Sequence, residues 1–146
     1  MRRHGIRKIL KWGAIGLVAL LLLIQLVPYG RDHANPSAGR QITWDSPRTK
    51  QLMTTSCMDC HSNLTRWPWY SNVAPASWLV QKDVDDGRRR LNLSTGNPDV
   101  ARMVEKIKDG SMPPWQYTLI HGGLSSRDKQ DLIRGLQATF GPSSGP

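Results

Sequence analysis

Five consecutive residues carry the densest chemistry in this chain: Cys57, Met58, Asp59, Cys60 and His61. The two cysteines are the only ones among 146 residues, and a histidine directly follows the second. This C-x-x-C-H spacing is the pattern at which a c-type haem is attached. The two thiols can form thioethers with two vinyl groups on one edge of the porphyrin, and the histidine then supplies an axial nitrogen to the iron. We therefore predict one covalent haem c held by Cys57, Cys60 and His61.

Three other interpretations of the cysteine pair fit the sequence less well. A disulfide across so short a loop would stabilise the fold little, because it removes little entropy from the unfolded chain. A redox dithiol belongs in a strand-then-helix context, which the sequence lacks, and a structural zinc ion takes four ligands. Haem attachment is the interpretation that also gives His61 a role.

The second axial ligand of the iron must come from a distant part of the chain. Met53 and Met58 lie too close to the attachment motif to cross the porphyrin, and Met103 fits the apolar stripe of a predicted helix. Met112 follows a helix end, and the two prolines after it stiffen the backbone that presents its sulfur. We predict Met112 as the second ligand, with a loop-filling role as the alternative and His121 as the runner-up ligand.

Aromatic residues shortly after His61 are candidates to wall one haem edge. Trp67 and Tyr70 are predicted to contact the cofactor, where an indole N–H or the phenol hydroxyl would bind a propionate, although core packing explains them equally well. A carbonyl from this aromatic stretch, or from the vicinity of Pro75, is expected to accept the Nδ1–H of His61. Arg66 suits a propionate by its geometry, but solvent exposure is the expected state for it.

Helix signals dominate the elements that must position these residues, and alternating strand patterns are hard to find. Helices are predicted from Pro47 to Ser56, from Pro75 through Leu79, between Asn97 and Gly110, and after Ser125. For the third helix we predict Asn97 as the N-cap and Pro98 in the first helical position. The predicted fold class is all-α, a cytochrome c-like helical domain around one attached haem, preceded by a transmembrane helix.

The core of this domain is short of aliphatic side chains. Residues 35–146 contain 19 Leu, Ile, Val and Phe among 112 positions, a share typical of chains that do not fold alone. We expect tryptophan to supply part of the missing core and a bound apolar group to supply more. The alternative is that the tryptophans, together with methionine and long aliphatic stems, suffice without a bound group. The five tryptophans concerned are Trp44, Trp67, Trp69, Trp78 and Trp115.

The amino terminus reads as a membrane segment. Sixteen uncharged residues run from Trp12 to Val27, and five basic residues precede them. This length lies between a cleaved signal and a full span, and we favour an uncleaved anchor in the cytoplasmic membrane. The basic flank predicts a cytoplasmic amino terminus and a periplasmic or otherwise extracytoplasmic haem domain. Nucleic acid is not an expected partner, because no binding signature accompanies the remaining charge.

Composition divides the chain into five parts. We predict a basic cytoplasmic flank, a transmembrane anchor, a linker, the haem domain and a disordered tail. Their residue ranges are 1–11, 12–28, 29–40, 41–140 and 141–146.

Several spaced motifs resemble the small bacterial haem-binding domain family over most of residues 40–140. The resemblance implies a single-haem, c-type, all-helical protein held to the membrane by its amino-terminal helix. The motifs are Cys57–Asn63, Thr65–Ser71, Val73–Pro75, Ser77–Leu79, Met112–Trp115 and Tyr117–His121.

Electron transfer is the function that these features favour. Iron held by both His61 and Met112 has no open position for a substrate, so we expect a one-electron carrier with an unidentified redox partner protein rather than an enzyme. A haem-based sensor or a peroxidase-like enzyme is the alternative, for which His121 is the available acid–base group. A third possibility is a haem-stabilised module that docks to a larger membrane redox complex.

Overall fold

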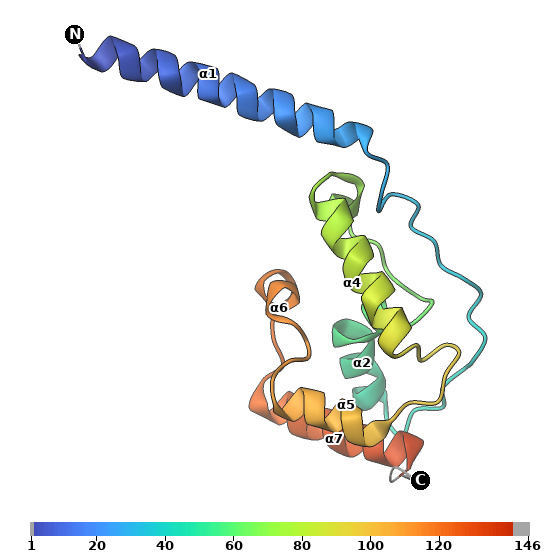
Figure 1. The fold of residues 1–146 in the computed structure, drawn as a ribbon. Coiled ribbons are helices and arrows are strands. Elements are labelled where there is room, and N and C mark those ends of the chain that lie inside the picture. The colour runs from blue at the N-terminus through green and yellow to red at the C-terminus, as the bar shows by residue number, and fades with distance from the viewer. Residues whose placement is uncertain (1, 142–146) are drawn as a thin grey trace. The chain divides into compact units, whose positions relative to one another are not determined.

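A computed structural model describes residues 2–141, and the side chains of residues 5–141 (Figure 1). Every regular element in this part of the chain is helical, which confirms the predicted all-α class. The predicted tail lies outside the described residues, apart from Gly141. The elements are α1 (Arg2–Leu23), η1 (Ile24–Leu26), α2 (Pro47–Ser56), α3 (Met58–His61), η2 (Trp69–Asn72), α4 (Ala76–Arg90), α5 (Val100–Lys108), α6 (Trp115–His121) and α7 (Ser126–Phe140), where η denotes a 3₁₀-helix.

The described chain forms two compact units. The first combines the residues up to His33 with Trp67–Asp83, and the second combines Ala34–Arg66 with the residues from Val84 onward. Helix α4 contributes its first half to one unit and its second half to the other. The attachment motif and Met112 both belong to the second unit.

An aliphatic cluster forms the core of the second unit, where α7 packs against both α2 and α5. The expected tryptophan core is wrong for Trp69 and Trp115, which are 80% and 73% exposed, and Trp44 only borders the cluster. Aliphatic side chains line the faces where the three helices meet, and they exclude water from these contacts. The core of this unit therefore does not require tryptophan side chains. The cluster consists of Leu52, Met53, Leu93, Val100, Val104, Ile107, Leu132 and Leu136.

Helices α2 and α7 begin where the sequence predicts, and a serine caps each start. The Ser46 hydroxyl accepts from the Thr49 amide at the start of α2, and Ser125 forms a capping box with Asp128 at the start of α7. The predicted N-cap of α5 is wrong. Asp99, rather than Asn97, accepts from the Arg102 amide at 3.0 Å.

A competing hydrogen bond explains why Asn97 is not the N-cap of α5. The Asn97 side chain accepts a hydrogen bond from Arg40 at 2.9 Å, so the carboxylate two residues later caps α5 instead. The segment with His121 is outside the predicted helices, whereas Trp115–His121 forms α6. Gly122 ends that helix at a φ of 80°, a conformation that glycine adopts without strain.

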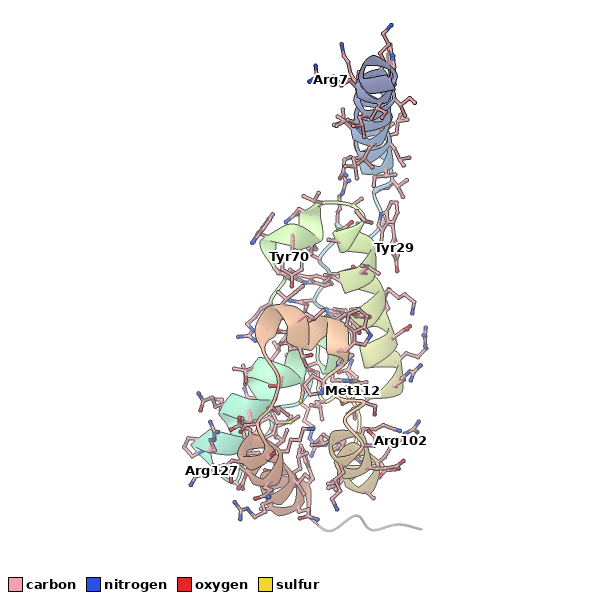
Figure 2. The ribbon with its side chains drawn as sticks, turned by 90° about the vertical axis from the view of Figure 1, so that its left-hand side faces the viewer. Arg7, Tyr29, Tyr70, Arg102, Met112 and Arg127 are labelled. Atoms are coloured by element: carbon pink, nitrogen blue, oxygen red, sulfur yellow. The ribbon has the colours of Figure 1, made fainter. Side chains whose placement is uncertain are left out.

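The first unit contains an apolar helix long enough to cross a membrane. This segment, Gly5–Leu26, has 22 residues, and a helix of that length spans about 33 Å. Its length and composition suit a membrane anchor and a signal sequence alike. The residues that follow it fold back onto Trp67–Asp83 within the same unit, where Tyr29 and Tyr70 lie at the end that adjoins α1 (Figure 2).

Candidate functional site

The attachment motif occupies a tight turn at the junction of two helices. Cys57 ends α2, where its amide donates to the Met53 carbonyl at 2.9 Å, and it also precedes the single turn of α3. The Cys57 carbonyl then accepts from the amides of Cys60 and His61, at 3.3 and 3.0 Å. Residues three and four apart share one face of a helical turn, so this turn brings the two thiols and the imidazole together.

The His61 ring is held through one nitrogen. Its Nδ1 lies 3.1 Å from the carbonyl oxygens of both Gly87 and Leu91. A carbonyl only accepts, so Nδ1 carries the proton and Nε2 keeps the lone pair that binds a metal. The expectation that Pro75 or the aromatic stretch would provide this carbonyl is wrong, because the end of α4 passes directly over the motif.

Gly87 permits this close approach of α4. A Cβ atom at position 87 would lie 2.3 Å from the carbonyl oxygen of Cys60, so any larger residue would push the helix away. The Leu93 amide adds a second link, since it donates to the His61 carbonyl at 2.8 Å. Backbone groups at the end of α4 and just after it therefore position the histidine.

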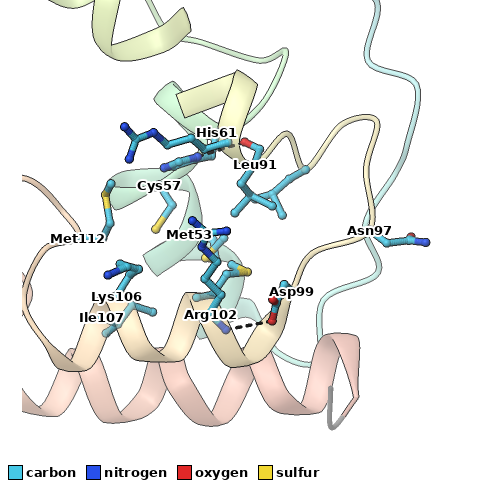
Figure 3. Close-up of a pocket in the computed structure, with 13 residues that line it drawn as sticks. Met53, Cys57, His61, Leu91, Asn97, Asp99, Arg102, Lys106, Ile107 and Met112 are labelled. Atoms are coloured by element: carbon cyan, nitrogen blue, oxygen red, sulfur yellow. Dashed lines mark hydrogen bonds between the residues drawn. The ribbon is translucent and has the colours of Figure 1, made fainter. Parts of the chain in front are cut away.

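His61 and Cys57 open onto a cavity of about 230 Å³ within the second unit (Figure 3). Met112 lines the same cavity, so three of the predicted haem ligands or attachment residues share it. Its apolar wall is contributed by α2, α5 and the segment that joins α4 to α5. The apolar residues of this wall are Met53, Leu91, Leu93, Met103 and Ile107.

Hydrogen bonds shape the loop that presents Met112. The Met112 amide donates to the Lys106 carbonyl at 3.0 Å, and Gly110 turns the chain at a φ of 76°. Asp109 accepts from the amide and the hydroxyl of Ser111, at 2.8 and 2.6 Å. These bonds from Ser111, together with one from Lys106, lower the pKa of Asp109 to about 2.

The other candidate ligands differ in position. Met53 is fully buried in the core cluster, and Met103 also faces the cavity. The exposed His121 lies at the end of α6, stacked on Tyr117 at 4.3 Å, and is not part of the cavity lining.

Positive charge gathers in the cavity lining, and the sequence analysis did not identify it. Arg90, Arg102 and Lys106 all contribute, and the Arg102 side chain points inward (Figure 3). Within residues 5–141, the guanidinium groups of Arg90 and Arg102 make no hydrogen bond or ion pair. Lys106 pairs with Asp109 at 3.1 Å. The only sequence signal for this cluster is the four-residue spacing of Arg102 and Lys106 on one helix face.

The thiols do not have the properties of a redox dithiol or a zinc site. No disulfide joins Cys57 and Cys60, and burial, followed by the proximity of Cys60, raises the pKa of Cys57 to about 12. A thiol with this pKa is neutral at pH 7, whereas reactive cysteines have lowered pKa values. Over the described residues, no three histidine, cysteine or acidic side chains cluster as metal ligands.

Arg66 serves the attachment motif rather than the cavity. It donates to both carboxylate oxygens of Asp59, at 3.1 and 2.8 Å, and to the Thr54 carbonyl at 2.8 Å. Its guanidinium is therefore engaged in bracing the turn between the two cysteines.

Trp67 and Tyr70 belong to the first unit and do not appear in the cavity lining. Trp67 stacks on His33 at 4.8 Å, and no residue in the described chain accepts a hydrogen bond from its indole N–H. Tyr70 meets Trp69 edge-on at 5.9 Å. Contact of Trp67 and Tyr70 with haem stays a prediction.

Comparison with known families identifies the kind of cofactor that this chain binds. The profile of the haem-binding domain family matches residues 19–138. The chain belongs to the haem-binding domain family. No curated protein and no solved structure matches it. This haem-binding domain is therefore a haem protein, as the spaced motifs predicted.

The residues of the cavity suit a haem. An imidazole with a free Nε2, a methionine sulfur and a thiol face one apolar space, and unpaired cations lie beside it to meet carboxylates. When haem is bound, its iron supplies a one-electron couple. In this haem-binding domain His61 and Met112 would ligate the iron, and Arg90 and Arg102 would hold the propionates.

Proposed function

We propose that this haem-binding domain is a membrane-anchored c-type haem protein that carries single electrons on the extracytoplasmic side of the cytoplasmic membrane. The observation that carries the proposal is the shared cavity of Cys57, His61 and Met112, with Nδ1 of His61 fixed by two carbonyls. This arrangement pairs an attachment residue with a nitrogen and a sulfur ligand.

Covalent attachment requires no oxidant in this proposal. Each thiol, of Cys57 and of Cys60, adds across one vinyl group, so that an S–C bond forms while the S–H and C=C π bonds are lost. The proton passes to the neighbouring vinyl carbon. Attachment through two thioethers explains why two cysteines precede the ligand histidine at this spacing.

Electron transfer is supported by how firmly both ligands are positioned. Two backbone carbonyls hold His61, and the bonds around Ser111 and Lys106 hold the loop of Met112. Ligands that move little between oxidation states suit a carrier, and a filled coordination sphere leaves no site for a substrate. Sulfur ligation by Met112 also favours the reduced iron and raises its potential.

A sensor or peroxidase-like function has less support. Such chemistry needs an acid–base group over the iron, and His61 is the only histidine in the cavity lining of the described chain. The carboxylate of Asp99, which does line the cavity, already caps α5. His121, the candidate for this role, stacks on Tyr117 outside the lining.

Anchoring is supported by the apolar helix and the charges around it. Five basic residues precede the apolar run, so the positive-inside tendency directs the amino terminus to the cytoplasm. They are Arg2, Arg3, Arg7, Lys8 and Lys11. The domain after α1 then lies in the periplasm or its equivalent, where c-type haem is attached.

Mass spectrometry and a pyridine haemochrome spectrum test the attachment. Protein purified from membranes of a host that attaches c-type haem should carry the mass of one haem and give the spectrum of a two-thioether haem. The Cys60→Ala variant should give a shifted spectrum, because one vinyl group stays unsaturated. A chain without added mass that is folded and binds dissociable haem would contradict c-type attachment.

A second experiment tests the axial sulfur and the carrier function. The near-infrared charge-transfer band of ferric sulfur ligation should vanish in Met112→Ala. It should persist in the control variant Met103→Ala, which removes a different methionine that lines the cavity from α5. Carbon monoxide should bind the reduced variant Met112→Ala rapidly and the unsubstituted protein slowly. Rapid binding to the unsubstituted protein would favour a ligand-binding function instead.

A further inference from the structure

The end of the apolar helix is clamped to a loop of the first unit. The Gln25 side chain donates from Nε2 to the Ala74 carbonyl at 2.9 Å and accepts at Oε1 from the Ala74 amide at 3.0 Å. Arg31 donates to the same Oε1 at 3.0 Å. One amide side chain thus satisfies both backbone groups of a residue 49 positions away, so the loop is attached directly to the end of the helix.

Contacts after the helix hold the same loop from a second side. His33 Nε2 lies 2.9 Å from the Ser71 hydroxyl, and its ring stacks on Trp67. Gly30, at a φ of 81°, lies so close to Ser77 that a Cβ atom would be 2.3 Å from its carbonyl oxygen. The segment between Gln25 and His33 is therefore an integral part of the first unit.

The position of Gln25 sets the depth of this loop in a membrane. Gln25 lies one residue before the end of the Gly5–Leu26 segment. The headgroup zone adds about 5–7 Å beyond each face of the hydrocarbon core. A backbone in hydrogen-bond contact with Gln25 therefore falls within that zone when the helix spans the bilayer.

The loop has the composition of a membrane interface. Residues 67–75 contain no charged side chain, and Trp69 and Val73 are 80% and 48% exposed. Leu26 and Tyr29, which flank the end of the apolar segment, are also exposed. Tryptophan and tyrosine concentrate at the headgroup level, because their rings are apolar and their N–H or O–H groups remain hydrated.

We propose that the loop around Trp69 and Val73 is a second membrane contact, inserted into the interface beside the end of α1. This inference rests on the proposed anchoring of the chain. The occupant of this exposed surface is the lipid headgroup layer, because the Gln25 clamp holds the surface at the depth of that layer. The contact fixes how the first unit sits on the membrane, which a single helix with a free linker would leave undefined.

Spin labels on the full-length haem-loaded protein test the inference. Each variant carries a single introduced cysteine for the label. The test positions are Trp69 and Val73, and Leu21 is the reference within the span. Gln137, an exposed residue on α7 of the second unit, is the control. Each variant is reconstituted into vesicles of phosphatidylcholine and phosphatidylglycerol, and label accessibility to oxygen and to a water-soluble nickel chelate is measured. Labelling of the unsubstituted protein gives the background.

The ratio of oxygen to nickel accessibility should be several-fold higher for Trp69→Cys and Val73→Cys than for Gln137→Cys, and below that for Leu21→Cys. Ratios at 69 and 73 equal to the Gln137 control, with a lipid-like ratio at 21, would overturn the inference and leave the anchor intact. A water-like ratio at 21 as well would overturn the anchor itself. Protection at 69 and 73 from both reagents would mean a protein contact and also overturn the inference.

Discussion

The position of His61 depends on the absence of a side chain at Gly87. The Gly87 carbonyl holds Nδ1 of the imidazole, and the absence of a side chain lets α4 lie against the Cys60 carbonyl. A hydrogen-bonded Nδ1 raises the basicity of Nε2 and fixes the ring plane. A glycine 26 positions after the histidine thus controls the orientation of the predicted axial ligand.

Gly87→Ala should destabilise the protein. The added methyl group would meet the Cys60 carbonyl at 2.3 Å, and overpacking of this kind costs about 1–3 kcal/mol. Urea unfolding followed by circular dichroism measures the loss. Gly123→Ala, where the nearest side-chain atom is 3.8 Å away, should change stability by less than about 0.5 kcal/mol. Equal effects of the two substitutions would contradict the close contact.

The cations of the cavity would act through their charge on a haem bound there. Arg102 points into the space that His61 and Met112 share, and its guanidinium has no partner within residues 5–141. A cation near the iron favours the reduced state, and a guanidinium also matches a propionate carboxylate.

Arg102→Ala should lower the reduction potential of the haem. Redox titration of the purified protein measures the shift. Arg127→Ala removes the same charge from α7, where Arg127 is no part of the cavity lining, and should leave the potential unchanged (Figure 2). A matching shift in both variants would show that net charge, rather than position in the cavity, is responsible.

Short polar turns at the element ends determine where the site residues point. Helix α5 supplies part of the apolar wall of the cavity, and the turn after it carries Met112. Asp109 stabilises that turn by accepting from both polar groups of Ser111. The geometry of the methionine loop therefore depends on one ionised carboxylate.

The pKa of Asp109, about 2, lies below its ordinary value of 3.8, so this carboxylate stabilises the fold above pH 3.8. That stabilisation is lost as the pH falls from about 3.8 through about 2. Asp109→Asn keeps an acceptor but cannot ionise, so its free energy of unfolding should depend less on pH in this window. Denaturant unfolding at several pH values measures the difference. Parallel curves for the two proteins would contradict the assignment, because Asp45 and Asp128, whose pKa values are also lowered, titrate in both.

At the scale of the whole molecule, the amino-terminal helix is not a separate module, because it belongs to one compact unit with Trp67–Asp83. The first unit includes α1 and Trp67–Asp83, with Gln25, Gly30 and His33 making contacts between them. Cleavage of the apolar helix as a signal would remove or free residues on which this unit depends.

The mature protein should therefore retain its apolar helix. Intact mass analysis of membrane-purified protein should give the uncleaved chain plus one haem. In the same protein, Gly30→Ala should lower the free energy of unfolding by about 1–3 kcal/mol, because the added Cβ would meet the Ser77 carbonyl. Gly39→Ala, whose Cβ would lie 3.3 Å from the nearest atom, is the milder control. An amino terminus that begins after residue 26 would show that the segment is a signal.

The local features of the site could be predicted from the sequence, because they depend on neighbouring residues. The attachment spacing, the helix starts at Pro47 and after Ser125, and the methionine-proline loop all involve positions within a few residues of one another. The family comparison confirms the haem-binding domain and the haem, while the axial role of Met112 stays a prediction.

Long-range contacts were decided only by the tertiary fold. The carbonyls that hold His61 come from Gly87 and Leu91, and Arg90 of α4 reaches the cavity that Arg102 and Lys106 of α5 also line, which sequence periodicity could not show. Backbone carbonyls are present at every residue and carry no sequence signal, so packing alone selects which one meets the imidazole. For the same reason the hydrogen bonds between Gln25 and Ala74 could not be predicted, because in the sequence Gln25 is a single amide within an apolar run.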